Sequence, residues 1–298
     1  MIDIGLVLDR SVHSLSPAEL ARRVQEIEAL GFESVWTLDP FGVDPFQVAA
    51  FVLANTSTLK AATGVATVYG RDPMGAVQIR MALSRYYPGR FMMGLGASNP
   101  IVVGKRGHEW VPPLTKMKAY LEQMESSQLG VAATSPIAPL YIAAHAPGLQ
   151  DLAVKHCDGI ITWILPPPLV AASRQRVGNE QAVTAEIPCV FSDDPVYARG
   201  VARAFLSIYI GLPYYQTAYG RLGFESSDYE QGGSDRLIDA IVAWGTPEEI
   251  RARVGEFEQA GASRLVLNLV KGPATGTPAV LDLETDWASL SGVAKALF

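Results

Sequence analysis

Cysteine and histidine are scarce in this sequence. Its 298 residues include two cysteines, Cys157 and Cys189, and four scattered histidines. The cysteines lie in unrelated segments without CxxC spacing, which argues against a disulfide framework and against a zinc site. No HExxH, P-loop or Ser-His-Asp order is present. We therefore expect no metal, no cofactor-free hydrolysis, and a reducing cytoplasm as the compartment.

A strongly basic surface and long apolar runs are also missing. The net charge is -6 and the 24 lysines and arginines are scattered, so the footprint of a nucleic-acid or anionic-membrane protein is absent. No apolar stretch reaches the roughly 20 residues of a membrane span, and residues 1–5 show no export signal. The expected partner is a small molecule.

What the sequence does contain is a repeated alternation of short apolar runs and amphipathic stretches. Hydrophobic residues make up 49% of the chain, and its length suits one α/β barrel of about 250 residues with insertions. We expect an α/β fold, a (β/α)8 TIM barrel, as one domain over residues 1–298. The predicted strands are Ile4–Leu8, Ser34–Leu38, Ala61–Val68, Phe91–Leu95, Leu140–Ala143, Gly159–Trp163, Ile187–Phe191 and Arg264–Asn268.

Helix-start signals separate these strands. Ser16-Pro17-Ala18-Glu19 and Thr246-Pro247-Glu248-Glu249 are capping boxes, and Asp72 precedes Pro73 as another predicted cap. Two stretches interrupt the alternation of predicted strands and helices. They predict rim insertions after strands four and seven, at residues 99–113 and 211–234. The second, rich in tyrosine and glycine, either covers a pocket or forms a surface excursion or subunit contact.

Chemistry in such barrels lies where the strands end. Asp39 follows strand two and either accepts a hydrogen bond from a ring N–H or hydroxyl, or stabilises the turn. Gly64 interrupts strand three and predicts a bulge or a close approach of backbone or ligand. Tyr69 and Arg71 are expected to face the pocket. His108 is either a proton shuttle or a solvated loop histidine.

Two further segments offer ligand contacts. Gly96-Ala97-Ser98-Asn99 lets a planar ligand lie against the backbone, but it lacks the third glycine of a dinucleotide fingerprint and no helix is expected directly behind it. The segment from Ala144 to Gly148 precedes a helix, so its amides either bind a phosphate or form an ordinary βα turn.

Taken together, the chain resembles the luciferase-like (bacterial luciferase superfamily) flavin and deazaflavin oxidoreductases over nearly its whole length. Tyr69-Gly70-Arg71-Asp72-Pro73 and Gly232-Gly233-Ser234-Asp235-Arg236-Leu237 with Ala243-Trp244-Gly245 further resemble the subfamily that uses the deazaflavin coenzyme F420. The segments that carry the family resemblance are Ala29–Trp36, Ala62–Val65, Pro88–Gly96 and Tyr141–Ala144.

The resemblance implies a ring bound against strands two to four, with a non-proline cis peptide that we place at Gly64–Val65, and a homodimer. We expect Asp39, Tyr69, Asn99 and His108 to be the catalytic residues. The implied cofactor-binding residues are Asp39, Gly64, Val65, Ala66, Thr67, Gly96, Ala97, Ser98, Asn99, Ala144, His145, Ala146, Pro147, Gly148, Thr162 and Trp163.

Two departures from the family pattern concern the proton donor. Many deazaflavin relatives have Asp-His where this chain has Asp39-Pro40, and the close subfamily tends to have Ser-His in place of Ser98-Asn99. The implied function is hydride transfer between F420 and a C=N, C=C or C=O bond, with protonation by water, Tyr69 or His108. The alternatives are a monooxygenase that uses flavin mononucleotide (FMN) and a non-catalytic flavin-binding barrel.

Overall fold

The eight principal strands form a closed parallel barrel. The computed structural model describes residues 2–9, 12, 14–39, 42–132, 134–273 and 283–298. The last barrel strand, β10, pairs in parallel with both β1 and β8, which closes the sheet. This confirms the TIM barrel. The barrel strands are β1 (Asp3–Leu8), β2 (Ser34–Thr37), β3 (Lys60–Thr63), β5 (Phe91–Gly96), β6 (Leu140–Ala143), β7 (Gly159–Trp163), β8 (Ala182–Val190) and β10 (Arg264–Lys271).

Three short strands extend this sheet. β4 (Ala66–Thr67) pairs with β5, and β9 (Ala243–Trp244) pairs with the end of β8. β11 (Glu284–Thr285) runs antiparallel to β10.

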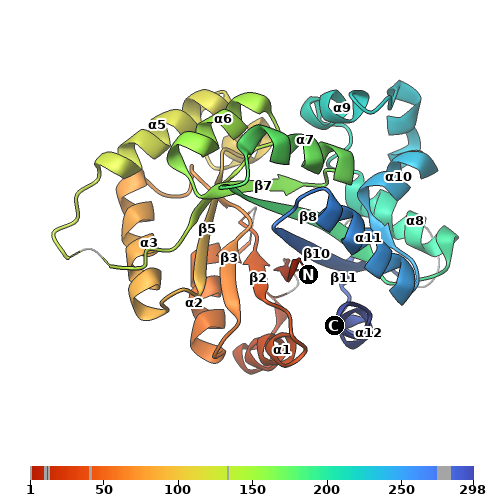
Figure 1. Ribbon diagram of the computed structural model, residues 1–298, viewed down its shortest axis with the longest axis horizontal. Helices are drawn as coiled ribbons and strands as arrows, with labels where there is room; N and C mark the ends of the chain where they lie inside the picture. Colours follow the sequence, from red (N-terminus) through yellow and green to blue (C-terminus); the bar gives the residue numbers. More distant parts are fainter. Residues whose placement is uncertain (1, 10–11, 13, 40–41, 133, 274–282) are drawn as a thin grey trace.

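Helices surround the strands, as Figure 1 shows. Most begin with proline, whose missing N–H has no intrahelical partner in the first turn. Both predicted capping boxes are present at Ser16 and Thr246, and Asp72 caps α3. The helices are α1 (Pro17–Ala29), α2 (Pro45–Asn55), α3 (Pro73–Tyr86), α4 (Pro100–Lys105), α5 (Pro113–Ser126), α6 (Pro147–His156), α7 (Pro167–Val177), α8 (Pro195–Leu206), α9 (Pro213–Gly220), the 3₁₀ helix η2 (Ser226–Gly232), α10 (Asp235–Ile241), α11 (Pro247–Gln259) and α12 (Leu290–Leu297).

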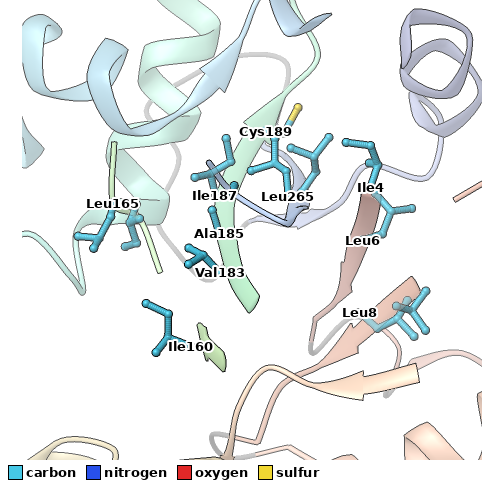
Figure 2. Close-up of a cluster of buried hydrophobic side chains, with 14 of the residues drawn as sticks. Ile4, Leu6, Leu8, Ile160, Leu165, Val183, Ala185, Ile187, Cys189 and Leu265 are labelled. Atoms are coloured by element: carbon cyan, nitrogen blue, oxygen red, sulfur yellow. The ribbon is translucent and has the colours of Figure 1, made fainter. Parts of the chain in front are cut away.

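The strands bury side chains on both faces. Alternate residues of β8, such as Val183 and Ile187, join the large apolar layer between strands and helices, and Figure 2 shows members of this layer from β1, β7, β8 and β10. A smaller apolar cluster fills the barrel interior and includes Trp36, Met92 and Tyr141. Parallel strands buried on both faces explain the near-continuous apolar runs of the sequence.

Two predicted strands differ most from the strands of the structure. The strand expected at Ala61–Val68 is divided into β3 and β4, and the break lies at Gly64–Val65, whose peptide bond is cis as expected. The strand expected at Ile187–Phe191 begins at Ala182 and ends at Val190. Its first half alternates threonine and glutamate with alanine and valine, and the polar members face the barrel interior instead of solvent.

The two insertions contain helices. The prediction that no helix opens behind Gly96-Ala97-Ser98-Asn99 is wrong, because α4 begins at Pro100 and the Asn99 side chain caps it by accepting from the Val102 amide at 3.0 Å. The second insertion forms α9 and η2 at one edge of the molecule (Figure 1), and η2 packs against α8 and α10. None of the described helices is long and apolar enough to cross a membrane.

Candidate functional site

Asp39 lies at the rim just past β2 and is held by two groups. One oxygen, Oδ2, accepts a hydrogen bond from the Thr67 amide at 2.6 Å, and the other, Oδ1, accepts from Arg106 Nη2 at 2.5 Å. The residue is 9% exposed. Thr67 was predicted at the site, but Arg106 was missed, although a buried rim carboxylate requires a cation or several donors.

The break in the third barrel strand brings small residues together. A Cβ added at Gly94 would lie 2.0 Å from the Thr63 carbonyl oxygen, and one added at Gly96 would lie 2.6 Å from Val65 Cγ2. These glycines therefore let β3 and β5 approach more closely than any side chain permits. The Gly64 amide donates to the Thr37 carbonyl at 2.9 Å, which ties the break to β2. The predicted segment Gly64–Thr67 thus lies beside Asp39.

Tyr69 and His108 line a cavity of about 460 Å³ next to this rim. Their ring centroids are 5.6 Å apart, and the Tyr69 hydroxyl accepts from the Val111 amide at 3.0 Å. Lys116 Nζ lies 4.5 Å from the centre of the Tyr69 ring. The two predicted proton donors are therefore together, in a cavity that α3, α5 and the segment after α4 enclose.

Ser98 and Asn99 have local structural roles. Ser98 adopts a left-handed backbone conformation with φ of 59°, and Asn99 uses its side-chain oxygen to cap α4. Ala97, Ser98 and Asn99 nevertheless follow β5 directly. They therefore lie at the same rim as the other predicted site residues, which are also at strand ends. Their assignment as cofactor ligands stays a prediction.

His145 is a neutral acceptor in the structure. Its Nε2 accepts from the Trp163 amide at 2.9 Å, and burial lowers its pKa to about 4. Tyr215 lies 5.3 Å from the imidazole, measured between ring centroids. Thr162 is fully buried on the neighbouring strand β7. The structure therefore brings the predicted pair Thr162 and Trp163 against the predicted loop at Ala144–Gly148.

The amino terminus of α6 adjoins a second cavity of about 170 Å³. The capping position is Ala146, which has no side-chain acceptor for the first amides of the helix. Arg176 and Arg221 line the same cavity, and Arg176 already forms an ion pair with Asp151 at 2.7 Å. Sequence reasoning missed both arginines, because they come from α7 and from the residue after α9.

A buried acid completes the site. Glu186 lies on β8, is 2% exposed, and burial raises its pKa well above the usual range. Its Oε1 has no hydrogen-bond partner among the described residues. Sequence reasoning missed it because the predicted strand began at Ile187, one residue later. Nor do the described ranges contain a cluster of three or more His, Cys, Asp or Glu side chains able to hold a metal ion.

The barrel closure, the broken third strand and the polar groups at the strand ends define a TIM-barrel protein with a candidate ligand site on its rim. The model of the family described as luciferase-like monooxygenase (Bac_luciferase) matches residues 6–264. The chain belongs to this family.

Proteins similar to this chain are described with different ring cofactors. A Mycobacterium tuberculosis protein, named provisionally as a coenzyme F420-dependent oxidoreductase, is 23% identical; the alignment covers 84% of this chain and 90% of the relative. The coenzyme F420-dependent tetrahydromethanopterin reductase from Methanopyrus kandleri has a TM-score of 0.77 at 16% identity, with 99% and 98% of the two chains covered. The oxygenating constituent of 3,6-diketocamphane monooxygenase from Pseudomonas putida, solved with FMN, has a TM-score of 0.71 at 13% identity, with 100% and 99% covered.

Proposed function

We propose that this protein is a coenzyme F420-dependent oxidoreductase that transfers a hydride between the deazaflavin and a C=N, C=C or C=O bond of a small organic substrate. The observation that carries the proposal is the broken third strand, where Gly64, Val65 and Thr67 lie beside the rim carboxylate Asp39. A backbone surface without bulky side chains suits a flat ring, and the relative named above as F420-dependent supports the choice of cofactor.

The residues present fit such a group. Each oxygen of Asp39 accepts one hydrogen bond in the structure and has capacity for another, which an N–H of the ring edge would use. The first turn of α6, capped only by Ala146, offers backbone amides and a positive helix end to a phosphate. Arg221 adds a cation beside it.

When bound, reduced deazaflavin supplies the hydride, and the protein supplies orientation and a proton. Tyr69 accepts from the Val111 amide and keeps its own O–H to donate, and His108 lies across the same cavity. We propose these two side chains, with Asp39 and Asn99, as the catalytic residues. Asn99 would act while its side-chain oxygen caps α4.

The alternative is an FMN-dependent monooxygenase. It is favoured by the family description and by the FMN complex of the Pseudomonas putida enzyme, whose fold matches over nearly the entire chain. The two functions differ in cofactor and in oxygen consumption. A non-catalytic flavin-binding barrel would bind a ring cofactor and turn over nothing.

Equilibrium titration with F420, reduced F420, FMN and reduced FMN tests the proposal. We expect saturable binding of F420 and weaker binding of FMN. Reduced F420 is then mixed anaerobically with a panel of cyclic imines, enones and ketones, and loss of the reduced cofactor is followed. Tight binding of FMN alone, with oxygen consumed in the presence of a reductase, would establish the alternative.

We further propose that the chain acts in the cytoplasm as a homodimer and folds as a single domain over residues 1–298. The resemblance to luciferase-like barrels, which commonly pair through helices on one side, supports the dimer. Light scattering on the eluting protein tests it, and a mass of one chain would contradict it.

A further inference from the structure

Polar groups without partners gather on one side of the barrel interior. Glu186 on β8 and Asn268 on β10 are 2% and 1% exposed. Glu186 Oε1 and Asn268 Oδ1 have no hydrogen-bond partner within the described ranges. Glu186 is opposite Val266 in the register of these two strands, and Val266 belongs to the apolar cluster that fills the interior. The acid therefore lies between this apolar cluster and a second unpartnered polar group, Asn268.

Glu186 reaches the break in the third strand. A Cβ added at Gly64 would lie 2.4 Å from Glu186 Oε1 and 3.0 Å from Trp36 Cε3. Gly64 begins the segment that carries the proposed ring site, and the missing side chain of this glycine leaves the space that the carboxyl fills. The unpartnered oxygen is thus at the inner wall of the rim, not at the far end of the barrel.

The protonation state of this acid follows from its surroundings. Burial raises the pKa of Glu186 well above its usual range, which favours the protonated, uncharged carboxyl. An unpaired polar atom in an apolar interior is unfavourable, and packing would be served better by leucine or methionine. In the part of the chain that is described, no ion pair offsets this cost. A neutral, buried acid next to a ligand site has the properties of a general acid.

We propose that Glu186 is a further catalytic residue and that it, in place of Tyr69 or His108, is the acid that protonates the substrate as it is reduced; this rests on the proposed hydride transfer. The hydride adds to the carbon of the C=N, C=C or C=O bond, and the π electrons move to the second atom. That atom takes the proton of the Glu186 carboxyl. The carboxylate that remains is reprotonated by water after the product leaves. The acid takes the place of the imidazoles that this chain lacks at Pro40 and Asn99.

Glu186→Gln tests the assignment, because glutamine keeps the shape and cannot release a proton. With the first electrophile of the panel that the wild type reduces, we expect the rate constant of reduced F420 oxidation to fall by about 10²–10⁴-fold. The dissociation constant for F420 should change by less than about threefold. Glu186→Asp should restore part of the rate. Thr184→Val is the matched control, since it removes another buried oxygen from β8 and should leave the rate unchanged.

Infrared difference spectra between the wild type and Glu186→Gln provide a readout that needs no turnover. A protonated-carboxyl C=O band at neutral pH, shifted when F420 or FMN binds, is the expected result. A missing band, a band that no ring cofactor shifts, or full turnover by Glu186→Gln would each overturn the proposal. Wild-type protein that binds neither F420 nor FMN would contradict the proposed function, and the presence or absence of the band would still decide whether Glu186 is held as an acid.

Discussion

At the residue scale, Asp39 and Arg106 form the charged contact on which the rim depends. The carboxylate is almost fully buried, whereas the guanidinium is partly exposed, and its Nε has no partner within the described residues. The arginine comes from the segment after α4, so this ion pair also attaches the first insertion to the end of β2. Removing one partner leaves the charge of the other partner desolvated and without a counter-charge.

We therefore expect Asp39→Asn to lower the free energy of unfolding by about 1–3 kcal/mol, because Arg106 loses its counter-charge. Urea unfolding followed by circular dichroism measures the change. Glu109→Gln, a charge change at an exposed position in the same insertion, should alter stability by less than about 0.5 kcal/mol. Arg106→Met added to Asp39→Asn should recover part of the loss. Equal effects of Asp39→Asn and Glu109→Gln would contradict this account.

His145 makes stability depend on pH. Its pKa is lowered to about 4 in the folded protein, whereas the unfolded side chain titrates near 6.5. Between these values the unfolded state binds more protons, so the free energy of unfolding decreases as the pH falls from about 6.5 to about 4. The full effect approaches about 3 kcal/mol.

Replacing His145 with glutamine, which retains an acceptor for the Trp163 amide, should flatten this dependence. Thermal unfolding at intervals between pH 7 and pH 4 tests the prediction. An unchanged slope in His145→Gln would mean that another group is responsible.

At the element scale, the parts of the site that follow from local signals were predictable. Capping boxes, prolines and the rhythm of apolar runs indicated the helices and the barrel, and Gly64 indicated the strand break. Glu186 escaped prediction because a polar residue in mid-strand resembles the start of a loop when the strand's partners are unknown. Arg106 and Arg221 escaped because their place beside the rim depends on how the insertions fold back.

The start of α6 illustrates the difference between what local sequence signals predict and what only the fold brings together. Ala146 and the residues around it predicted an anion site, but only the fold shows two arginines at the same cavity. Arg176 is already paired with Asp151, whereas no ion pair of Arg221 is present in the described ranges. Arg221 is therefore the residue whose charge remains for an anionic ligand.

Arg221→Ala should weaken F420 binding by about three- to tenfold, which is the contribution of one exposed charged hydrogen bond. Fluorescence titration at low and high salt checks it, and the difference between the proteins should shrink as salt screens the charge. Arg176→Ala, whose charge is already compensated, should have the smaller effect. The reverse order would place the anionic group elsewhere.

At the scale of the whole molecule, closure of the barrel connects the two ends of the sequence. β10 lies between β1 and β8, and α12 packs against α11 on the outside. A closed sheet has no edge strand at which unfolding can begin independently. The described part of the chain should therefore lose its structure in one cooperative transition.

A substitution that creates a cavity under α12, near the carboxyl terminus, tests this cooperativity. Leu290 on α12 is fully buried, and Leu290→Ala should cost about 2–5 kcal/mol. In each protein, tryptophan fluorescence and circular dichroism should report one common midpoint, which is lower in the variant. Lys295→Ala, an exposed change on the same helix, is the control and should be close to neutral. Two separate transitions would show that α12 unfolds independently of the barrel.

The aromatic side chains behind the rim have an optical consequence. Trp163 lies edge-on to Phe205 and Tyr209, with ring centroids 6.0 and 5.8 Å away, and Tyr209 in turn contacts Tyr215. Energy absorbed by these tyrosines passes to the indole by resonance transfer over such short distances. Part of the emission excited in the tyrosine band therefore leaves through Trp163, one of five tryptophans, at the end of β7. A ring bound at the proposed site would quench this part of the emission.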